Sequence, residues 1–220
     1  MHEDVRRVLA EAEADDAVVG VYVMGSRALG VADEASDWDV VVVRREGDPS
    51  HVKTDTMDLI GTTLERMGKA SVHELPALAH ARVLLDKTGE VGAALTAARS
   101  IGRDELAELY DGYLNDVYRS LKAWRRGREL GARVQCGRSL WWLGEFLIGV
   151  AGVRAPYPSS WAGVLGELEP LILEVARTAD PTLQQELCRR VEAIASEHGF
   201  RDVYDAWDGD IDRVLAFDFD

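Results

Sequence analysis

Two aspartates, Asp37 and Asp39, stand two residues apart at the start of an apolar run, residues 40–43. Because side chains alternate between the two faces of a strand, both carboxylates are expected on the same face. Carboxylates this close repel each other unless a cation lies between them. Oxygen ligands at this spacing suit Mg²⁺, which binds one or two protein carboxylates together with substrate phosphates. The pair therefore predicts a site for a metal ion and a phosphate-bearing ligand.

A glycine–serine turn precedes this pair of carboxylates. Residues 18–23 and residues 40–43 are rich in valine, and each run predicts a buried strand. Gly25 lets the backbone turn tightly after the first strand, and Ser26 offers a hydroxyl and an N–H where the next segment begins. A nucleoside triphosphate with its metal is the ligand that this arrangement fits.

The motif formed by residues 24–27 and 36–40 resembles the signature of the polymerase-β-like nucleotidyltransferases, in which a Gly-Ser turn is followed by Asp-x-Asp on the next strand. The resemblance covers roughly the first third of the chain. It implies an enzyme that transfers a nucleoside monophosphate, expected to be AMP, from a triphosphate to a hydroxyl and releases pyrophosphate. It also implies a third carboxylate on a neighbouring strand.

Two aspartates compete for the place of that third carboxylate. Asp58 is flanked by Met57, Leu59 and Ile60, which suit a strand in the sheet, whereas Asp55 lies among threonine and lysine. We therefore prefer Asp58. If Asp58 proves to lie on the opposite face from Asp37 and Asp39, Asp55 takes its place.

The resemblance also implies roles for individual residues. Asp37, Asp39 and Asp58 would be the catalytic residues and would hold Mg²⁺, with two ions expected. Asp58 would serve as ligand or as general base, with Glu74 as an outside candidate for the base. Turn amides would hold the outer phosphates, and a cation would compensate their charge. The expected nucleotide-binding residues are Gly25, Ser26, Arg27, Ser36, Tyr118 and Lys122.

Composition narrows the range of partners. The 220 residues include 39 acidic and 25 basic residues, so the formal net charge is −14. This charge opposes binding to a polyanion, and it steers a cationic small molecule inward. We therefore expect no nucleic-acid acceptor, although a solvated acidic surface accounts for the charge equally well. The oligomeric state is left open.

Cysteine usage and hydropathy indicate a soluble, cytoplasmic protein without a membrane partner. The two cysteines, Cys136 and Cys188, lie far apart and lack metal-ligand spacing, so we expect reduced thiols. The most apolar later segment, residues 140–153, is too short to span a bilayer and contains Glu145.

Strand patterns end near residue 101, and helical periods follow. We expect an α+β protein, with a mixed-sheet nucleotidyltransferase domain flanked by helices over residues 1–101 and an all-helical substrate-side domain over residues 102–220. The periodicity of residues 104–128 places Lys122 at the edge of an apolar stripe and Arg119 and Arg126 on the side opposite it. In the next helix, residues 134–150, we expect Trp141, Trp142, Phe146 and Leu147 in the core.

The acceptor is the least determined part of the prediction. Size, acidity and a two-domain layout are similar to antibiotic-modifying enzymes of the aminoglycoside or lincosamide type, so a small hydroxylated molecule is the first expectation. Two alternatives stay open, namely a protein-modifying enzyme of the antitoxin type and a catalytically silent nucleotide-binding or interaction module. The sequence does not identify the preferred nucleotide.

Overall fold

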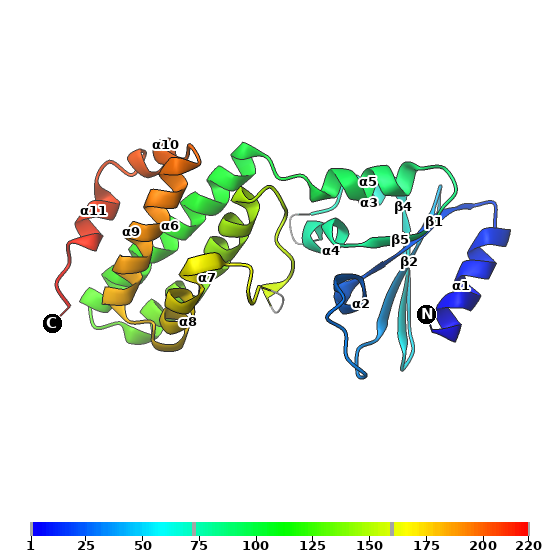
Figure 1. Ribbon diagram of the computed structural model, residues 1–220, viewed down its shortest axis with the longest axis horizontal. Coiled ribbons are helices and arrows are strands. Elements are labelled where there is room, and N and C mark those ends of the chain that lie inside the picture. Colours follow the sequence, from blue (N-terminus) through cyan, green and yellow to red (C-terminus); the bar gives the residue numbers. More distant parts are fainter. Residues whose placement is uncertain (1, 72–73, 159–160, 220) are drawn as a thin grey trace. The chain divides into compact units, whose positions relative to one another are not determined.

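The computed structural model describes residues 2–71, 74–158 and 161–219. The chain divides into two compact units, Met1–Ser100 and Ile101–Asp220. The first unit holds a five-stranded mixed sheet with flanking helices, and in the second every element among the described residues is a helix (Figure 1). This architecture confirms the predicted α+β class.

The sheet of the first unit has the strand order β3-β4-β2-β1-β5. Strands β2 and β4 are parallel, and the other neighbouring pairs are antiparallel. The strand predicted around Asp58 is β4. The five strands are β1 (Val18–Met24), β2 (Trp38–Arg44), β3 (Ser50–Lys53), β4 (Met57–Thr63) and β5 (Arg82–Asp86).

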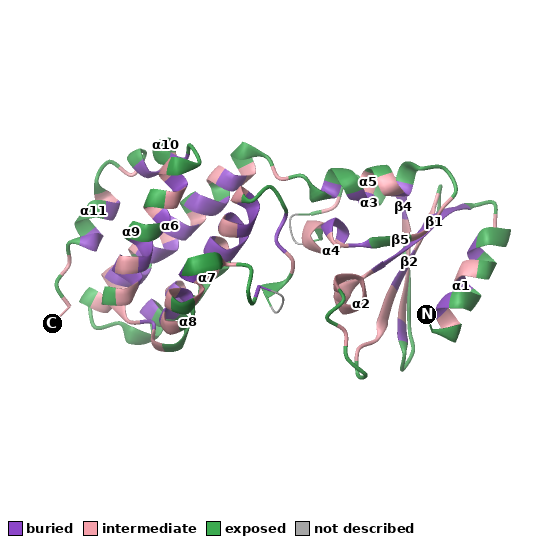
Figure 2. Cartoon of the chain, viewed as in Figure 1, coloured by how far each residue is buried: buried purple, intermediate pink, exposed green. Residues whose placement is uncertain are grey.

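Helices cover both faces of this sheet. Helix α1 (Glu3–Ala14) packs Val5, Val8 and Ala12 against one face, while α3, α4 and α5 contribute to a second apolar cluster on the other (Figure 1). Burial on both faces explains why β1 reads as an almost continuous apolar run, and Figure 2 shows it buried along most of its length. The remaining helices are α2 (Gly25–Leu29), α3 (Leu64–Met67), α4 (Leu75–Ala79) and α5 (Glu90–Arg99).

The edge strand β3 was not predicted from the sequence, which indicated only a turn at residues 47–50. All four of its residues are exposed, and it pairs with β4 in antiparallel register from Ser50 opposite Gly61 to Lys53 opposite Asp58. A short polar segment carries little hydrophobic pattern. Its strand conformation therefore depends on pairing with β4 rather than on burial.

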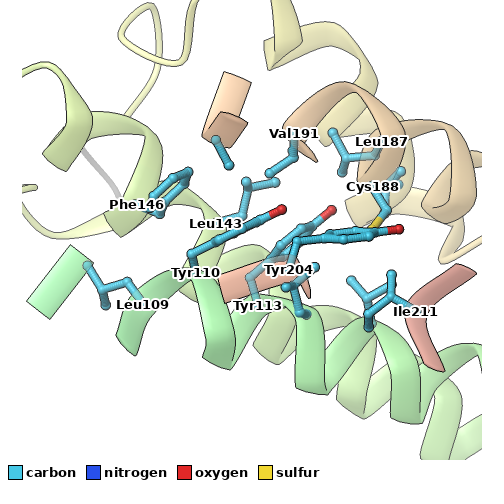
Figure 3. Close-up of a cluster of buried hydrophobic side chains, with 14 of the residues drawn as sticks. Leu109, Tyr110, Tyr113, Leu143, Phe146, Leu187, Cys188, Val191, Tyr204 and Ile211 are labelled. Atoms are coloured by element: carbon cyan, nitrogen blue, oxygen red, sulfur yellow. The ribbon is translucent and has the colours of Figure 1, made fainter. Parts of the chain in front are cut away.

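The second unit is built on a long helical hairpin of α6 (Arg103–Arg125) and α7 (Glu129–Val150). Its core combines aromatic and aliphatic side chains, with Tyr110 stacked on Phe146 at 5.0 Å between ring centroids (Figure 3). No helix among the described residues is long and apolar enough to cross a membrane. The later elements are η2 (Gly166–Leu168), α8 (Glu169–Thr178), α9 (Pro181–Glu197), α10 (Arg201–Asp205) and α11 (Asp210–Leu215).

The aromatic residues of α7 divide between core and surface. Phe146 is fully buried, and Trp142 packs against the core and donates its indole N–H to the buried carboxylate of Asp116 over 3.0 Å. Trp141 is 45% exposed and contacts Trp161 at 6.0 Å between centroids, so its assignment to the core was wrong. Adjacent helical residues point about 100° apart, and only one of two neighbouring tryptophans can face the hairpin partner.

We expect Phe146→Ala to destabilise the helical unit by about 3–5 kcal/mol, because it leaves a cavity between Tyr110 and Phe200. Urea denaturation followed by circular dichroism measures the change. Leu130→Ala, on the same helix at a side that is 79% exposed, is the control and should have little effect. A similar loss from both substitutions would contradict this description of the core.

Candidate functional site

The structure brings Asp37, Asp39 and Asp58 to one face of the sheet. In the parallel pairing of β2 with β4, Asp39 lies directly opposite Asp58, and paired residues of neighbouring strands point to the same side. Asp37 immediately precedes β2. Its Oδ2 lies 3.4 Å from Nζ of Lys53, which also contacts Oδ2 of Asp58 at 3.0 Å. A single ammonium group thus joins the carboxylate that precedes β2 to the carboxylate on β4.

Gly25 makes room for the carboxylate of Asp39. The glycine follows β1 with a φ of 69°, a left-handed conformation that L side chains rarely adopt. A β-carbon at this position would collide with Oδ2 of Asp39. The Gly-Ser turn and the second aspartate therefore depend on each other sterically, although they lie on different segments.

The three carboxylates influence one another electrostatically. Burial raises the pKa of Asp39, and the nearby charges of Asp37 and Asp58 raise it further. By contrast, the hydrogen bond from Lys53 lowers the pKa of Asp58, with a smaller contribution from His51. Asp39 is therefore the carboxylate whose ionised form most needs an added positive charge.

Lys53 and His51 were not predicted to belong to this site. Both lie on β3, and Nε2 of His51 is 3.4 Å from Oδ1 of Asp58. Their spacing of two residues places them on the same side of the strand, which is the signal that sequence reasoning could have used. That signal is usable only when β3 is known to be a strand in register with β4.

The donor set suits a divalent cation. Aspartate oxygens are the ligands that Mg²⁺ prefers, and the Lys53 ammonium already provides a positive charge between two of the carboxylates. With Lys53 in this place, no three histidine, cysteine, aspartate or glutamate side chains in the described part of the chain stand grouped as ligands of one metal ion, so binding requires these side chains to rearrange. Because the Lys53 side chain is 64% exposed, it can leave its position at little cost.

Arg27 and Ser36 shape the loop that leads to Asp37. Nη2 of Arg27 donates to the carbonyl oxygen of Ser36 over 2.6 Å, and its guanidinium lies 5.3 Å from the ring centroid of Trp38. The Ser36 hydroxyl donates to Oδ1 of Asp33 over 2.8 Å. Both predicted nucleotide-binding residues are thus engaged within the loop, and Ser26 lies in the first turn of α2.

The two alternative carboxylates lie in other surroundings. Asp55 is exposed in the turn between β3 and β4, before the strand that carries Asp58. Glu74 accepts hydrogen bonds from the backbone N–H and the hydroxyl of Ser71, both at 2.7 Å, and the backbone bond is the main reason that its pKa is lowered. Glu74 therefore stabilises the turn before α4.

Tyr118 and Lys122 lie in the helical unit. Nζ of Lys122 donates to the Tyr118 hydroxyl over 2.9 Å and lies 4.4 Å from the centre of its ring. Arg119 and Arg126 are exposed, which agrees with their expected place opposite the apolar stripe, and they line the same pocket as Lys122. Because residues four apart on a helix lie on one face, Lys122 and Arg126 line the same side of this pocket.

Comparison with known proteins supports the resemblance in the sheet unit. Residues 5–76, which include all three aspartates, match the family model described as "Nucleotidyltransferase domain". This match supports the nucleotidyltransferase superfamily and a transferase of that kind, and it leaves the branch of the superfamily undetermined. No curated protein gives a significant match.

Among solved structures, the chain matches a nucleotidyltransferase-like protein from Exiguobacterium sibiricum 255-15. The alignment covers 96% of this chain and 77% of the other, with 14% sequence identity and a TM-score of 0.48.

We expect Lys53→Met to lower the melting temperature of the metal-free protein at neutral pH, because it leaves the carboxylates without their shared cation. Since the pKa of Asp58 is lowered in the folded state, its stabilising contribution is present above the ordinary value of 3.8. It is lost as pH falls through the lowered value. The difference from the wild type should therefore shrink below pH 3.8.

Thermal unfolding across a pH series measures this difference. Lys69→Met is the matched control, since Lys69 pairs with Glu65 on an exposed helical surface. If Lys53→Met behaves like this control at every pH, the bridging contact contributes nothing to the folded state.

Proposed function

We propose that this chain transfers a nucleoside monophosphate, with AMP as the first choice, from a Mg²⁺-bound triphosphate to a hydroxyl of a small molecule. The observation that carries the proposal is the placement of Asp39 opposite Asp58 on parallel neighbouring strands, with Asp37 linked to Asp58 through Lys53. These residues lie within the segment that matches the nucleotidyltransferase domain.

In this proposal Asp37, Asp39 and Asp58 hold the metal ions, two being expected. When bound, Mg²⁺ would neutralise phosphate charge and favour ionisation of the attacking hydroxyl. The raised pKa of Asp39 agrees with this assignment, because an added positive charge is what would offset the repulsion from its two neighbours. Lys53 must then give up its place between the carboxylates.

The reaction itself requires mainly positioning and charge neutralisation. The acceptor oxygen forms a bond to the α-phosphorus of the triphosphate, and the bond from that phosphorus to the bridging oxygen breaks, so that pyrophosphate leaves. Asp58 either orients the acceptor as a ligand or takes its proton as general base. The Lys53 contact lowers the pKa of Asp58 and so opposes the second role while the contact persists.

The nucleotide is proposed to bind along the Gly-Ser turn, with the amides of Gly25 and Ser26 near the outer phosphates. Arg27 and Ser36 would support it by fixing the loop before Asp37. Lys122 and Tyr118, within the proposed helical domain of residues 102–220, are proposed as further nucleotide-binding residues. The catalytic domain is proposed to comprise residues 1–101.

The acceptor is proposed to be a small, hydroxylated and cationic molecule, such as an antibiotic of the aminoglycoside or lincosamide type, modified in the cytoplasm. The net charge of −14 supports a cationic rather than a polyanionic acceptor. A screen of such molecules, with pyrophosphate release as the readout, tests this choice. Release only with a protein acceptor would favour the antitoxin-type alternative.

Asp39→Asn should reduce nucleotidyl transfer at least about 100-fold. It removes a metal ligand at almost constant volume, and metal ions supply several kcal/mol of charge stabilisation in such reactions. The melting temperature without metal should stay the same or rise, because a repelling charge is lost. Chelation of divalent ions with EDTA should also abolish turnover, and added Mg²⁺ should restore it.

Asp55→Asn is the matched control for this substitution, since it makes the same chemical change in the exposed β3–β4 turn. It should leave turnover close to that of the wild type. Near-normal activity of Asp39→Asn would mean that the chemistry takes place elsewhere. A large loss of thermal stability in that variant would point to a structural role for the carboxylate.

A further inference from the structure

A pocket of about 450 Å³ opens in the helical unit between the end of α6 and the start of α7. This volume lies within the range of small-molecule binding sites. Both helices belong to the same compact unit, and so does the turn between them. The polar side chains of its lining belong to Tyr118, Arg119, Lys122, Arg126, Arg128 and Gln135.

The charge of this pocket is opposite to that of the chain. Four of its lining side chains are cationic and none is acidic, although the formal net charge of the whole chain is −14. Among the described residues, none of these four cations forms an ion pair, and Lys122 has the Tyr118 hydroxyl as its partner. Elsewhere in the unit ion pairs are the rule for arginine, as for Arg103, Arg133, Arg138, Arg177, Arg190, Arg201 and Arg213.

Helix-end stabilisation accounts for only part of this cluster. Cations near the end of α6 interact favourably with the negative end of the helix dipole, which suits Lys122 and Arg126. Arg128, however, is the N-cap residue of α7, where a positive charge is unfavourable and where its side chain makes no capping hydrogen bond. Four cations without an acidic partner among the described residues repel one another, and an anion bound between them would relieve that repulsion.

Other groups in the lining indicate what else the ligand carries. Gly131 lies in the first turn of α7, where backbone N–H groups lack helical partners and favour phosphate oxygens. Gln135 also lines the pocket, and its Oε1 is buried without a hydrogen-bond partner in the described part of the chain.

We infer that this pocket binds a phosphate-bearing small molecule, held by Arg119, Lys122, Arg126 and Arg128 around its oxyanions. All of these side chains belong to the helical unit. If the ligand is the donor triphosphate, the inference deepens the proposed role of Lys122 and Tyr118 and rests on the proposed function. The phosphates could belong to the donor triphosphate or to a second phosphorylated molecule. Both sources share the chemistry that the pocket recognises, and a competition experiment separates them.

The test measures binding of tripolyphosphate to the full-length protein by isothermal titration calorimetry, without magnesium. The double variant Arg119→Gln/Arg126→Gln should weaken binding about tenfold or more, because it removes two charge-assisted contacts. Arg190→Gln, which removes one charge from α9, is the control for bulk charge and should change binding far less. Raising the salt concentration should weaken binding to the wild type.

Competition with ATP then identifies the source of the phosphates. If ATP displaces tripolyphosphate and the double variant weakens both ligands, the pocket holds the donor triphosphate. If ATP binds without displacing tripolyphosphate, the pocket serves a second phosphorylated ligand. Binding to the double variant as tight as to the wild type, or a loss no greater than that of Arg190→Gln, would overturn the inference. Because no acceptor or metal is present, failure of the transfer reaction would not alter this result.

Discussion

The candidate site depends on one constraint, the parallel pairing of β2 with β4, which sets Asp39 directly opposite Asp58. Without a balancing positive charge, carboxylates held this close lower the stability of the fold. Lys53 provides part of that balance from the edge strand β3, and Gly25 leaves the space that the Asp39 carboxylate occupies. Sheet register, turn conformation and charge balance are therefore parts of a single arrangement.

That arrangement also explains why the edge strand is polar. All four residues of β3 are exposed, so the strand makes few apolar contacts. Instead, its Lys53 and His51 contact the carboxylate of Asp58. Because the Lys53 ammonium is exposed, its displacement costs little free energy. In the proposed function, a bound metal ion would take its place without disturbing the sheet. In the proposed function, stability and metal binding would therefore depend on the same carboxylates.

The sequence predicted the fold class and the placement of Asp37, Asp39 and Asp58 on one face of the sheet, because valine-rich strands and the Asp-x-Asp spacing carry strong periodic signals. It did not identify Lys53 or His51, because their position depends on a hairpin register that four polar residues do not encode by themselves. The exposed Trp141 was assigned to the core on side-chain type, although its neighbour Trp142 already takes the inward direction. Arg126 is exposed opposite the apolar stripe as expected, but its spacing of four from Lys122 puts both side chains in the lining of one pocket, which the sequence analysis did not use.

The net charge of the chain acts on a large partner through the sum of all its charges. An excess of acidic residues repels a large polyanion, but charges in solution at physiological ionic strength are screened beyond about 8 Å. A local group of arginines and lysine can therefore attract a small anion within a chain whose overall charge is −14. The expectation of no nucleic-acid partner and the proposed binding of a phosphorylated small molecule are compatible, because the first depends on the sum of all charges and the second on the few side chains around one pocket.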